Sequence, residues 1–179
     1  MIDNQELIVP TQEKVWTSER RIQAFNTFSE AFKPILNTIY YPGSNIDISP
    51  SNTASFQGNK IIYVDTDKSA IQTLQRRGYD AHVENATVFD PGEVNLLLLL
   101  NFYAEQPLKY VVKAGYAICN GHWTGTVDKM LGQNDFKLVG VFTDENQTLE
   151  TDEKTLRKNS QTSNPGKRNA ETLFIFRKE

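Results

Sequence analysis

One apolar run, Val94 to Leu100, constrains the fold of this chain more than any other feature. Its length suits a β-strand, and its side chains are apolar apart from Asn95, so a strand here needs cover on both faces. That requirement is typical of the central strand of a parallel sheet packed between helices. The run is too short for a membrane span, which takes roughly 18 apolar residues, so we expect no membrane segment.

Strand and helix patterns alternate on both sides of this run. They predict an α/β fold with a mostly parallel, doubly wound, seven-stranded sheet and helices on both faces. A long helix is expected to begin after Thr17 or Ser18 and to break or kink near Pro34, and Asp67 is expected to cap a helix. The expected strands are 38–41, 60–64, 81–84, 94–100, 116–119, 136–142 and 172–176, and the expected helices after the first strand are 68–77, 108–113 and 124–131.

We expect a single domain, because 179 residues fall in the usual range for one domain. Residues 1–33 are predicted to form an N-terminal arm and helix, and the arm is a candidate contact for a protein partner. Residues 143–171 are polar and mixed in charge, so they are predicted to be a long insertion before the last strand, with at most a helical turn at 153–158.

Composition narrows the classes of function. A net charge of −3 gives the whole protein no attraction to nucleic acid or to anionic membranes. The single cysteine, Cys119, cannot form an internal disulfide, and the polar N-terminus lacks a signal-peptide pattern, so we expect a cytoplasmic protein. One cysteine and two histidines do not complete the usual zinc-ligand set, so no metal site is expected.

A glycine turn and an acidic strand end follow two successive strand patterns. The turn is Tyr41-Pro42-Gly43-Ser44-Asn45-Ile46-Asp47, and Asp65 ends the next strand about 20 residues after Gly43. In α/β folds that hold nucleoside-containing cofactors, the glycine lets backbone approach the ligand and the carboxylate accepts hydrogen bonds from ribose hydroxyls.

These residues, and the later candidates Asp67 and Asn85, each have a purely structural interpretation as well. Gly43 suits any tight turn, and Asp65 could be an ordinary carboxylate at a strand end. Asp47 and Asn85 could each stabilise their own turn. Asp67 fits a helix cap better than a ligand contact.

Four segments carry a further pattern: Tyr41 to Asp47, Val64 to Ile71, Glu84 to Pro91, and Val94 to Asn101 followed by Phe102-Tyr103. Their order resembles the class I S-adenosylmethionine-dependent methyltransferase family over residues 34–142, with the final strand added. The resemblance implies an antiparallel last strand beside the strand at 136–142. The first motif differs from the family pattern, since Asn45 stands in place of the second glycine, and the loop after the fourth strand is Asn-Phe-Tyr.

The resemblance implies S-adenosylmethionine as cofactor and assigns roles to particular residues. Asp65 would accept hydrogen bonds from the ribose, Asn85 would contact the adenine, and Gly43 would face the methionine part. The full cofactor set is Gly43, Ser44, Asp47, Asp65, Thr66, Asn85 and Ala86. The residues expected to face the methyl-transfer site are Asn101, Tyr103 and His122.

Three hypotheses about function remain open. The first is an S-adenosylmethionine-dependent methyltransferase whose methyl acceptor is unknown. The second is a catalytically inactive protein of the same fold that serves in binding or regulation. The third, a dinucleotide-binding oxidoreductase, is weaker because no G-x-G-x-x-G segment precedes a helix.

Overall fold

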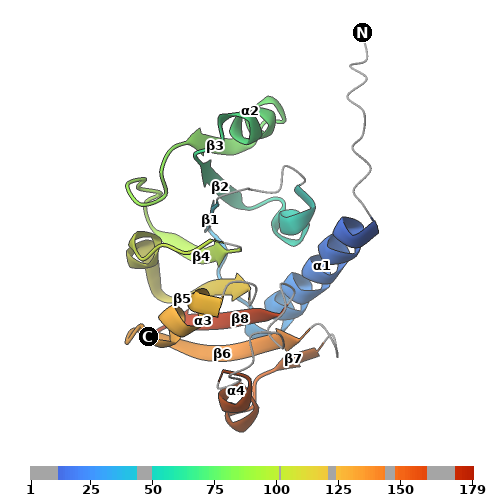
Figure 1. Ribbon diagram of the computed structural model, residues 1–179, viewed down its shortest axis with the longest axis vertical. Coiled ribbons are helices and arrows are strands. Elements are labelled where there is room, and N and C mark those ends of the chain that lie inside the picture. Colours follow the sequence, from blue (N-terminus) through green and yellow to red (C-terminus); the bar gives the residue numbers. More distant parts are fainter. Residues whose placement is uncertain (1–11, 44–49, 101, 121–123, 144–147, 161–171) are drawn as a thin grey trace.

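The computed structural model describes residues 12–43, 50–100, 102–120, 124–143, 148–160 and 172–179. Within these residues, eight strands form one sheet in the order β3-β2-β1-β4-β5-β8-β6-β7 (Figure 1). The strands are β1 (Thr38–Pro42), β2 (Lys60–Asp65), β3 (Asp80–Val83), β4 (Val94–Leu99), β5 (Val111–Asn120), β6 (Phe136–Thr143), β7 (Thr148–Glu150) and β8 (Leu173–Lys178). The helices are α1 (Gln12–Phe32), α2 (Lys68–Arg76), α3 (Thr124–Leu131) and α4 (Glu153–Ser160), with 3₁₀ helices η1 (Pro50–Phe56) and η2 (Gln106–Tyr110).

The strand directions confirm a mostly parallel sheet with an antiparallel last strand. From β3 to β5, each neighbouring pair is parallel. β8 lies antiparallel between β5 and β6, and β7 adds an antiparallel edge strand beside β6. The described sheet has one strand more than the seven predicted, because β7 and helix α4 occupy part of the segment expected to be a polar insertion.

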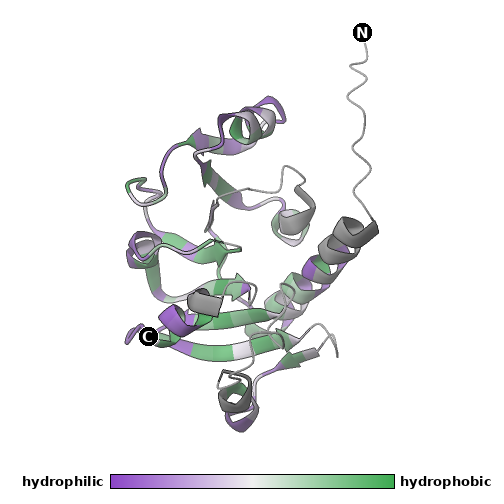
Figure 2. Ribbon diagram, in the orientation of Figure 1, coloured by the Kyte–Doolittle hydropathy of each residue, from purple (hydrophilic) through white to green (hydrophobic). Residues whose placement is uncertain are grey.

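Helices cover both faces of the sheet, as predicted. Alternate residues of β4 point to opposite sides, so Leu96 and Leu98 enter one core while Leu97 and Leu99 enter the other. Helices α1 and α2 and η1 pack on the first side, whereas η2, α3 and α4 pack on the second. Figure 2 shows hydrophobic residues running along the central strands between these layers.

Two helix predictions were wrong: the first helix does not begin after Thr17 or Ser18, and the segment 108–113 is not an α-helix. α1 begins at Gln12 and ends at Phe32, two residues before Pro34, with Lys33 in a left-handed conformation at φ 45°. The expected helix over 108–113 is instead η2 followed by β5. A register shift lies between Val94 and Leu96 on β4, and Ala114 at φ 64° lies in the matching part of β5. Tertiary pairing with β4 therefore draws these residues into a strand.

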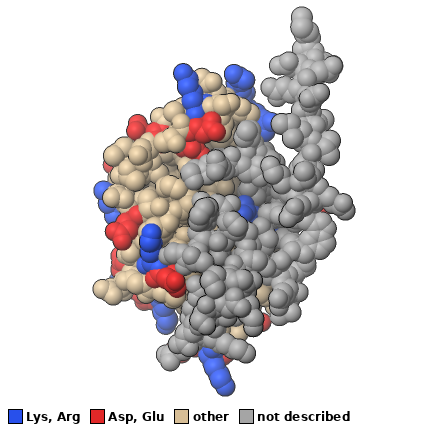
Figure 3. Space-filling view, viewed as in Figure 1, with Lys and Arg blue, Asp and Glu red and all other residues tan. Residues whose placement is uncertain are grey.

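The surface carries charges of both signs. Figure 3 shows Lys and Arg side chains interspersed with Asp and Glu over the described part of one face. A surface on which both signs are mixed has no large field of one sign, and such a field is what would attract a polyanion such as nucleic acid. None of the described helices has the length and apolar composition that crossing a membrane requires.

Two buried tyrosines on neighbouring strands provide a matched test of the core. Tyr63 shares a 2.7 Å hydrogen bond with the Thr53 hydroxyl, whereas the Tyr40 hydroxyl is buried with no hydrogen-bond partner among the described residues. Burial raises the pKa of both phenols. We expect Tyr63→Phe to lose about 0.5–1.5 kcal/mol of unfolding free energy, the net worth of one hydrogen bond, and Tyr40→Phe to lose none. Urea denaturation checks this, and an equal loss in both variants would contradict it.

Candidate functional site

The carboxyl ends of five strands meet in one row across the sheet. Asp65 on β2 pairs with Val83 on β3, and the register of β1 with β2, continued by one residue, brings Gly43 beside Asp65. The registers of β1 with β4 and of β4 with β5 continue this line to Leu100 and Asn120. We call Val83, Asp65, Gly43, Leu100 and Asn120 the carboxyl-end row.

The row crosses the point where the chain changes direction within the sheet. From β1 the chain moves outward through β2 to β3, and it then returns to place β4 on the other side of β1. Open α/β sheets bind ligands outside the carboxyl ends of their strands at such a switch point. Gly43 follows β1 and therefore lies at the centre of the candidate site.

Asp65 is held in place by backbone contacts on both sides. Gly43 N donates to Val64 O at 2.9 Å, and Glu84 N donates to Asp65 O at 3.1 Å. The Asp65 carboxylate oxygen Oδ1 accepts a hydrogen bond from Asp67 N at 2.9 Å, and the residue is only 2% exposed. The backbone bonds fix the strand end, and the bond from Asp67 N orients the carboxylate before any ligand arrives.

The two residues after Asp65 differ in role. Thr66 is exposed at the start of the turn. Asp67 Oδ1 accepts from Ser69 N at 3.0 Å and from Ala70 N at 3.1 Å. Asp67 is therefore the N-cap of α2, as predicted, and its carboxylate satisfies backbone groups that the helix leaves unpaired.

Asn85 and Ala86 form a turn after β3. Asn85 Oδ1 accepts from Thr87 N and from Thr87 Oγ1, both at 2.9 Å. The backbone oxygen of Asn85 also accepts from Phe89 N at 3.1 Å, and Ala86 is buried in the second core. The side-chain oxygen thus stabilises its own turn, which is the structural interpretation given for Asn85 above.

Tyr103 follows β4, and its side chain contacts the region of α3. Gln133 Nε2 donates to the Tyr103 hydroxyl at 3.3 Å, and Lys129 Nζ lies 5.0 Å from the ring centre. Burial raises the pKa of the Tyr103 phenol, and the carboxylate of Glu105 raises it further. A phenol with a raised pKa ionises less readily, so Tyr103 is poorly suited to act as a general base near neutral pH.

Four of the residues predicted for the site lie outside the described part of the chain. Those predicted for the cofactor are Ser44 and Asp47, and those predicted for methyl transfer are Asn101 and His122. Their assignments therefore stay predictions.

Three members of the carboxyl-end row were not predicted as site residues, and Leu100 among them was predicted only as the end of the apolar strand. Val83 is apolar yet 46% exposed beside Asp65, and Asn120 is a polar residue that is only 1% exposed at the end of β5. Both end a strand, and strand ends are where site residues gather in such sheets. Their place in the same row as Asp65 becomes apparent only from the strand registers.

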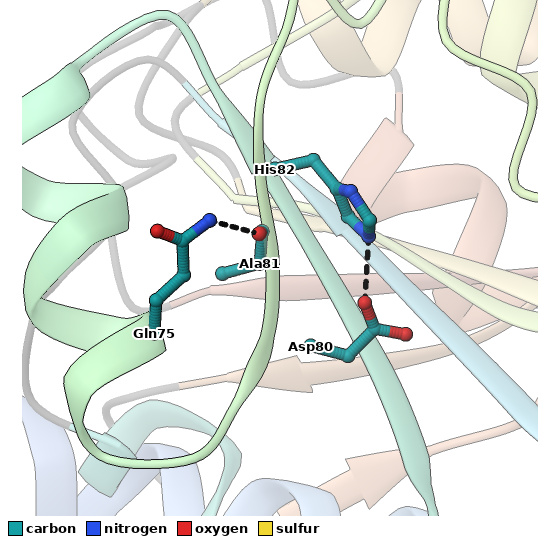
Figure 4. Close-up of polar contacts among 4 residues, drawn as sticks. All are labelled: Gln75, Asp80, Ala81 and His82. Atoms are coloured by element: carbon teal, nitrogen blue, oxygen red, sulfur yellow. Dashed lines mark hydrogen bonds and ion pairs between the residues drawn. The ribbon is translucent and has the colours of Figure 1, made fainter.

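A histidine–carboxylate pair lies on β3, on the face opposite to the one that carries Val83. His82 Nε2 and Asp80 Oδ1 are 2.6 Å apart, and Figure 4 shows the pair beside the bond from Gln75 Nε2 to Ala81 O. Side chains alternate along a strand, so this exposed pair points away from the face that carries Val83. Among the described residues, no three metal-ligating side chains gather in one place.

No family model and no curated protein sequence matches this chain. Solved methyltransferase structures share its fold. "StiE O-MT residues 961-1257" is 13% identical with a TM-score of 0.56, over 93% of this chain and 76% of that chain. The plantazolicin methyltransferase BpumL in complex with SAH is 11% identical with a TM-score of 0.58, over 94% and 86%. The N-methyltransferase NodS from Bradyrhizobium japonicum WM9 is 12% identical with a TM-score of 0.58, over 93% and 98%.

These similarities establish a class of fold. The chain has the α/β fold of class I S-adenosylmethionine-dependent methyltransferases, as the sequence resemblance implied. The parallel strands from β3 to β5 and the antiparallel β8 beside β6 are the parts of the sheet that the resemblance predicted. At identities of 10–13%, the similarity concerns the fold alone.

Proposed function

We propose that this chain binds S-adenosylmethionine along the carboxyl-end row and transfers its methyl group to an acceptor. The observation that carries the proposal is the placement of Asp65 beside Gly43 at the switch point of the sheet. BpumL, which has the same fold, was crystallised with SAH, and this supports a cofactor of that type.

The residues of the row suit such a ligand chemically. The Asp65 carboxylate would accept hydrogen bonds from the ribose hydroxyls, and bonds to a charged acceptor are the stronger kind. Gly43 has no Cβ, so the ligand could approach the backbone there. Val83 offers exposed apolar surface beside Asp65 for the adenine ring.

The cofactor would supply the methyl group and its sulfonium leaving group. The protein's part would be to hold the acceptor in line with that methyl group and to exclude water, which accounts for much of the barrier reduction in such displacements. Asp65, oriented in advance by Asp67 N, would fix one end of the ligand.

Calorimetric titration with S-adenosylmethionine and SAH tests the proposal. We expect micromolar binding to the wild type and a loss of at least about tenfold in Asp65→Ala, because one charge-assisted hydrogen bond is worth that much. Asp67→Asn is the matched control, since asparagine also caps helices well and the substitution lies two residues away. Absence of heat from the folded wild type at millimolar ligand would overturn the proposal, as would equal affinity in Asp65→Ala.

A binding protein of the same fold without methyl transfer is the second candidate. Asn45 replaces the second glycine of the first motif. In the described residues between β1 and β2, a 3₁₀ helix is present where parallel strands are usually joined by an α-helix. SAH binding together with absence of methyl transfer to any acceptor would favour this candidate.

A further inference from the structure

A buried arginine lies on the side of α1 that packs against the sheet. Arg21, Phe25, Phe28 and Phe32 follow one another at intervals of three or four residues, so they lie along one side of the helix. The Phe28 ring packs on Tyr116 of β5, which belongs to the core on this side of the sheet. Arg21 continues the same stripe and is only 5% exposed. A charged side chain therefore occupies a position where the pattern of the helix calls for an apolar one.

The neighbouring 3₁₀ helix η1 indicates which end of the sheet Arg21 is near. The ring centres of Phe25 and Phe56 are 4.9 Å apart, and Ser55 Oγ donates to Ile22 O at 3.0 Å. Lower residue numbers in α1 therefore lie beside lower residue numbers in η1. The chain passes through η1 on its way from the carboxyl end of β1 to the start of the parallel strand β2. The earlier residues of both helices accordingly lie toward the carboxyl ends of the strands.

The helix η1 also relates Arg21 to the candidate site. Its Thr53 hydroxyl shares a 2.7 Å hydrogen bond with the Tyr63 hydroxyl on β2. Asp65 follows Tyr63 by two residues, so both side chains lie on the side of the sheet that α1 and η1 cover. Side chains in a helix point back toward its N-terminus, so the guanidinium of Arg21 extends toward the carboxyl-end row.

Arg21 and Asp65 are the two charged side chains that are buried among the residues whose burial the structure describes. Burial of a charge is costly unless an opposite charge or hydrogen bonds compensate for it. Arg21 has contacts within the protein, and its five N–H donors allow it to serve a ligand as well. A guanidinium fits a carboxylate with two parallel hydrogen bonds, so a ligand carboxylate is the group that best suits this position.

We propose that Arg21 binds the amino-acid carboxylate of S-adenosylmethionine and thereby selects nucleosides that carry an amino acid. The inference rests on the proposed function. The two buried charges would recognise two parts of one ligand, because ribose hydroxyls donate to Asp65 and a carboxylate accepts from Arg21. Arg21 lies outside the four segments that carry the sequence resemblance, so the sequence did not indicate this role.

Calorimetric titration of the wild type and of Arg21→Met with two ligands tests the inference. The ligands are SAH and 5′-methylthioadenosine, which keeps the adenosine and the thioether sulfur but lacks the amino acid. We expect the affinity for SAH to fall about 10- to 100-fold in Arg21→Met, because the variant leaves the carboxylate without its charged partner. The affinity for 5′-methylthioadenosine should change by less than about twofold. Methionine places an unbranched apolar side chain on the buried stripe of α1, so the variant should stay folded.

Arg76→Met is the matched control, because Arg76 is exposed in the last turn of α2. It should leave both affinities unchanged. An unchanged affinity for SAH in Arg21→Met would overturn the inference. An equal loss for both ligands would also overturn it, because Arg21 would then act through Asp65 or through the fold. If the wild type binds both ligands and only these Arg21→Met results fail, the proposed function stands, whereas a wild type that binds neither ligand contradicts the proposed function itself.

Discussion

The Gly115→Ala variant is expected to lose about 2–3 kcal/mol of unfolding free energy, toward the upper end for overpacking. A Cβ on Gly115 would lie 2.9 Å from Val112 O, 3.0 Å from Asn95 O and 3.0 Å from the Val111 side chain. Two of these neighbours are backbone atoms of β4 and β5, so they cannot rotate away. Because natural domains have only about 5–15 kcal/mol of stability, this loss would be large.

Gly132→Ala is the matched control for this substitution. The nearest atom to a Cβ on Gly132 is Lys129 O at 3.4 Å, which is a tolerable contact. Its unfolding free energy should stay level or rise by about 0.4–1 kcal/mol, because alanine restricts the unfolded chain. Urea denaturation followed by circular dichroism compares the two. A Gly115→Ala variant as stable as Gly132→Ala would show that the bulge in β5 can relax, contrary to this expectation.

The Phe28→Ala variant is expected to lose more unfolding free energy, about 3–5 kcal/mol, which is the usual loss when a buried aromatic ring is removed. Phe28 is buried, and its ring packs edge-on against Tyr116, with the ring centres 5.2 Å apart. The ring of Phe32 is tilted against it, with the ring centres 5.6 Å apart. These contacts join α1 to β5, so the loss should appear both in global stability and as faster hydrogen exchange along α1.

Ile35→Ala provides the comparison, since Ile35 is 71% exposed just after α1. Substitutions at exposed positions usually change the free energy of unfolding by no more than about 0.5 kcal/mol. If Phe28→Ala lost as little unfolding free energy as Ile35→Ala, the Phe28 ring would not be what holds α1 to the sheet. Thermal unfolding and hydrogen exchange on both variants distinguish the two results.

The seven predicted strands could be located from the sequence because each of them carries a local signal. The apolar run from Val94 is buried on both faces as its composition requires. The cap at Asp67 was equally predictable, because a capping side chain bonds within three residues of itself. Local chemistry of this kind needs no knowledge of the rest of the fold.

Features that depend on pairing between distant strands were not predictable in the same way. The residues before Gly115 were expected to be helical, yet β4 pairs with them as a bulged strand. The edge strand β7 was missed because its three residues form a strand only beside β6. Propensity does not decide such cases, since a partner far along the chain supplies the hydrogen bonds.

The residues of the candidate site also fall into two groups, those that local sequence identifies and those that depend on pairing between distant strands. Gly43 and Asp65 were found from their spacing, and the register of β1 with β2 brings them together. Val83 and Asn120 escaped notice because their place in the row depends on registers across several strands. The structural interpretation of Asn85 was predictable from the sequence, since its side-chain oxygen bonds to Thr87 only two residues away, whereas its contact with adenine stays a prediction.

The position of β8 bears on how the chain assembles as it is synthesised. β8 lies between β5 and β6, and within the described sheet it alone joins the β6–β7 pair to the parallel strands. The pair therefore cannot dock in its native place until β8 has emerged from the ribosome. Until then, the hydrogen-bonding edges of β5 and β6 stay open, and such edges can pair wrongly with other chains. The sheet should accordingly become continuous only when β8 inserts between β5 and β6.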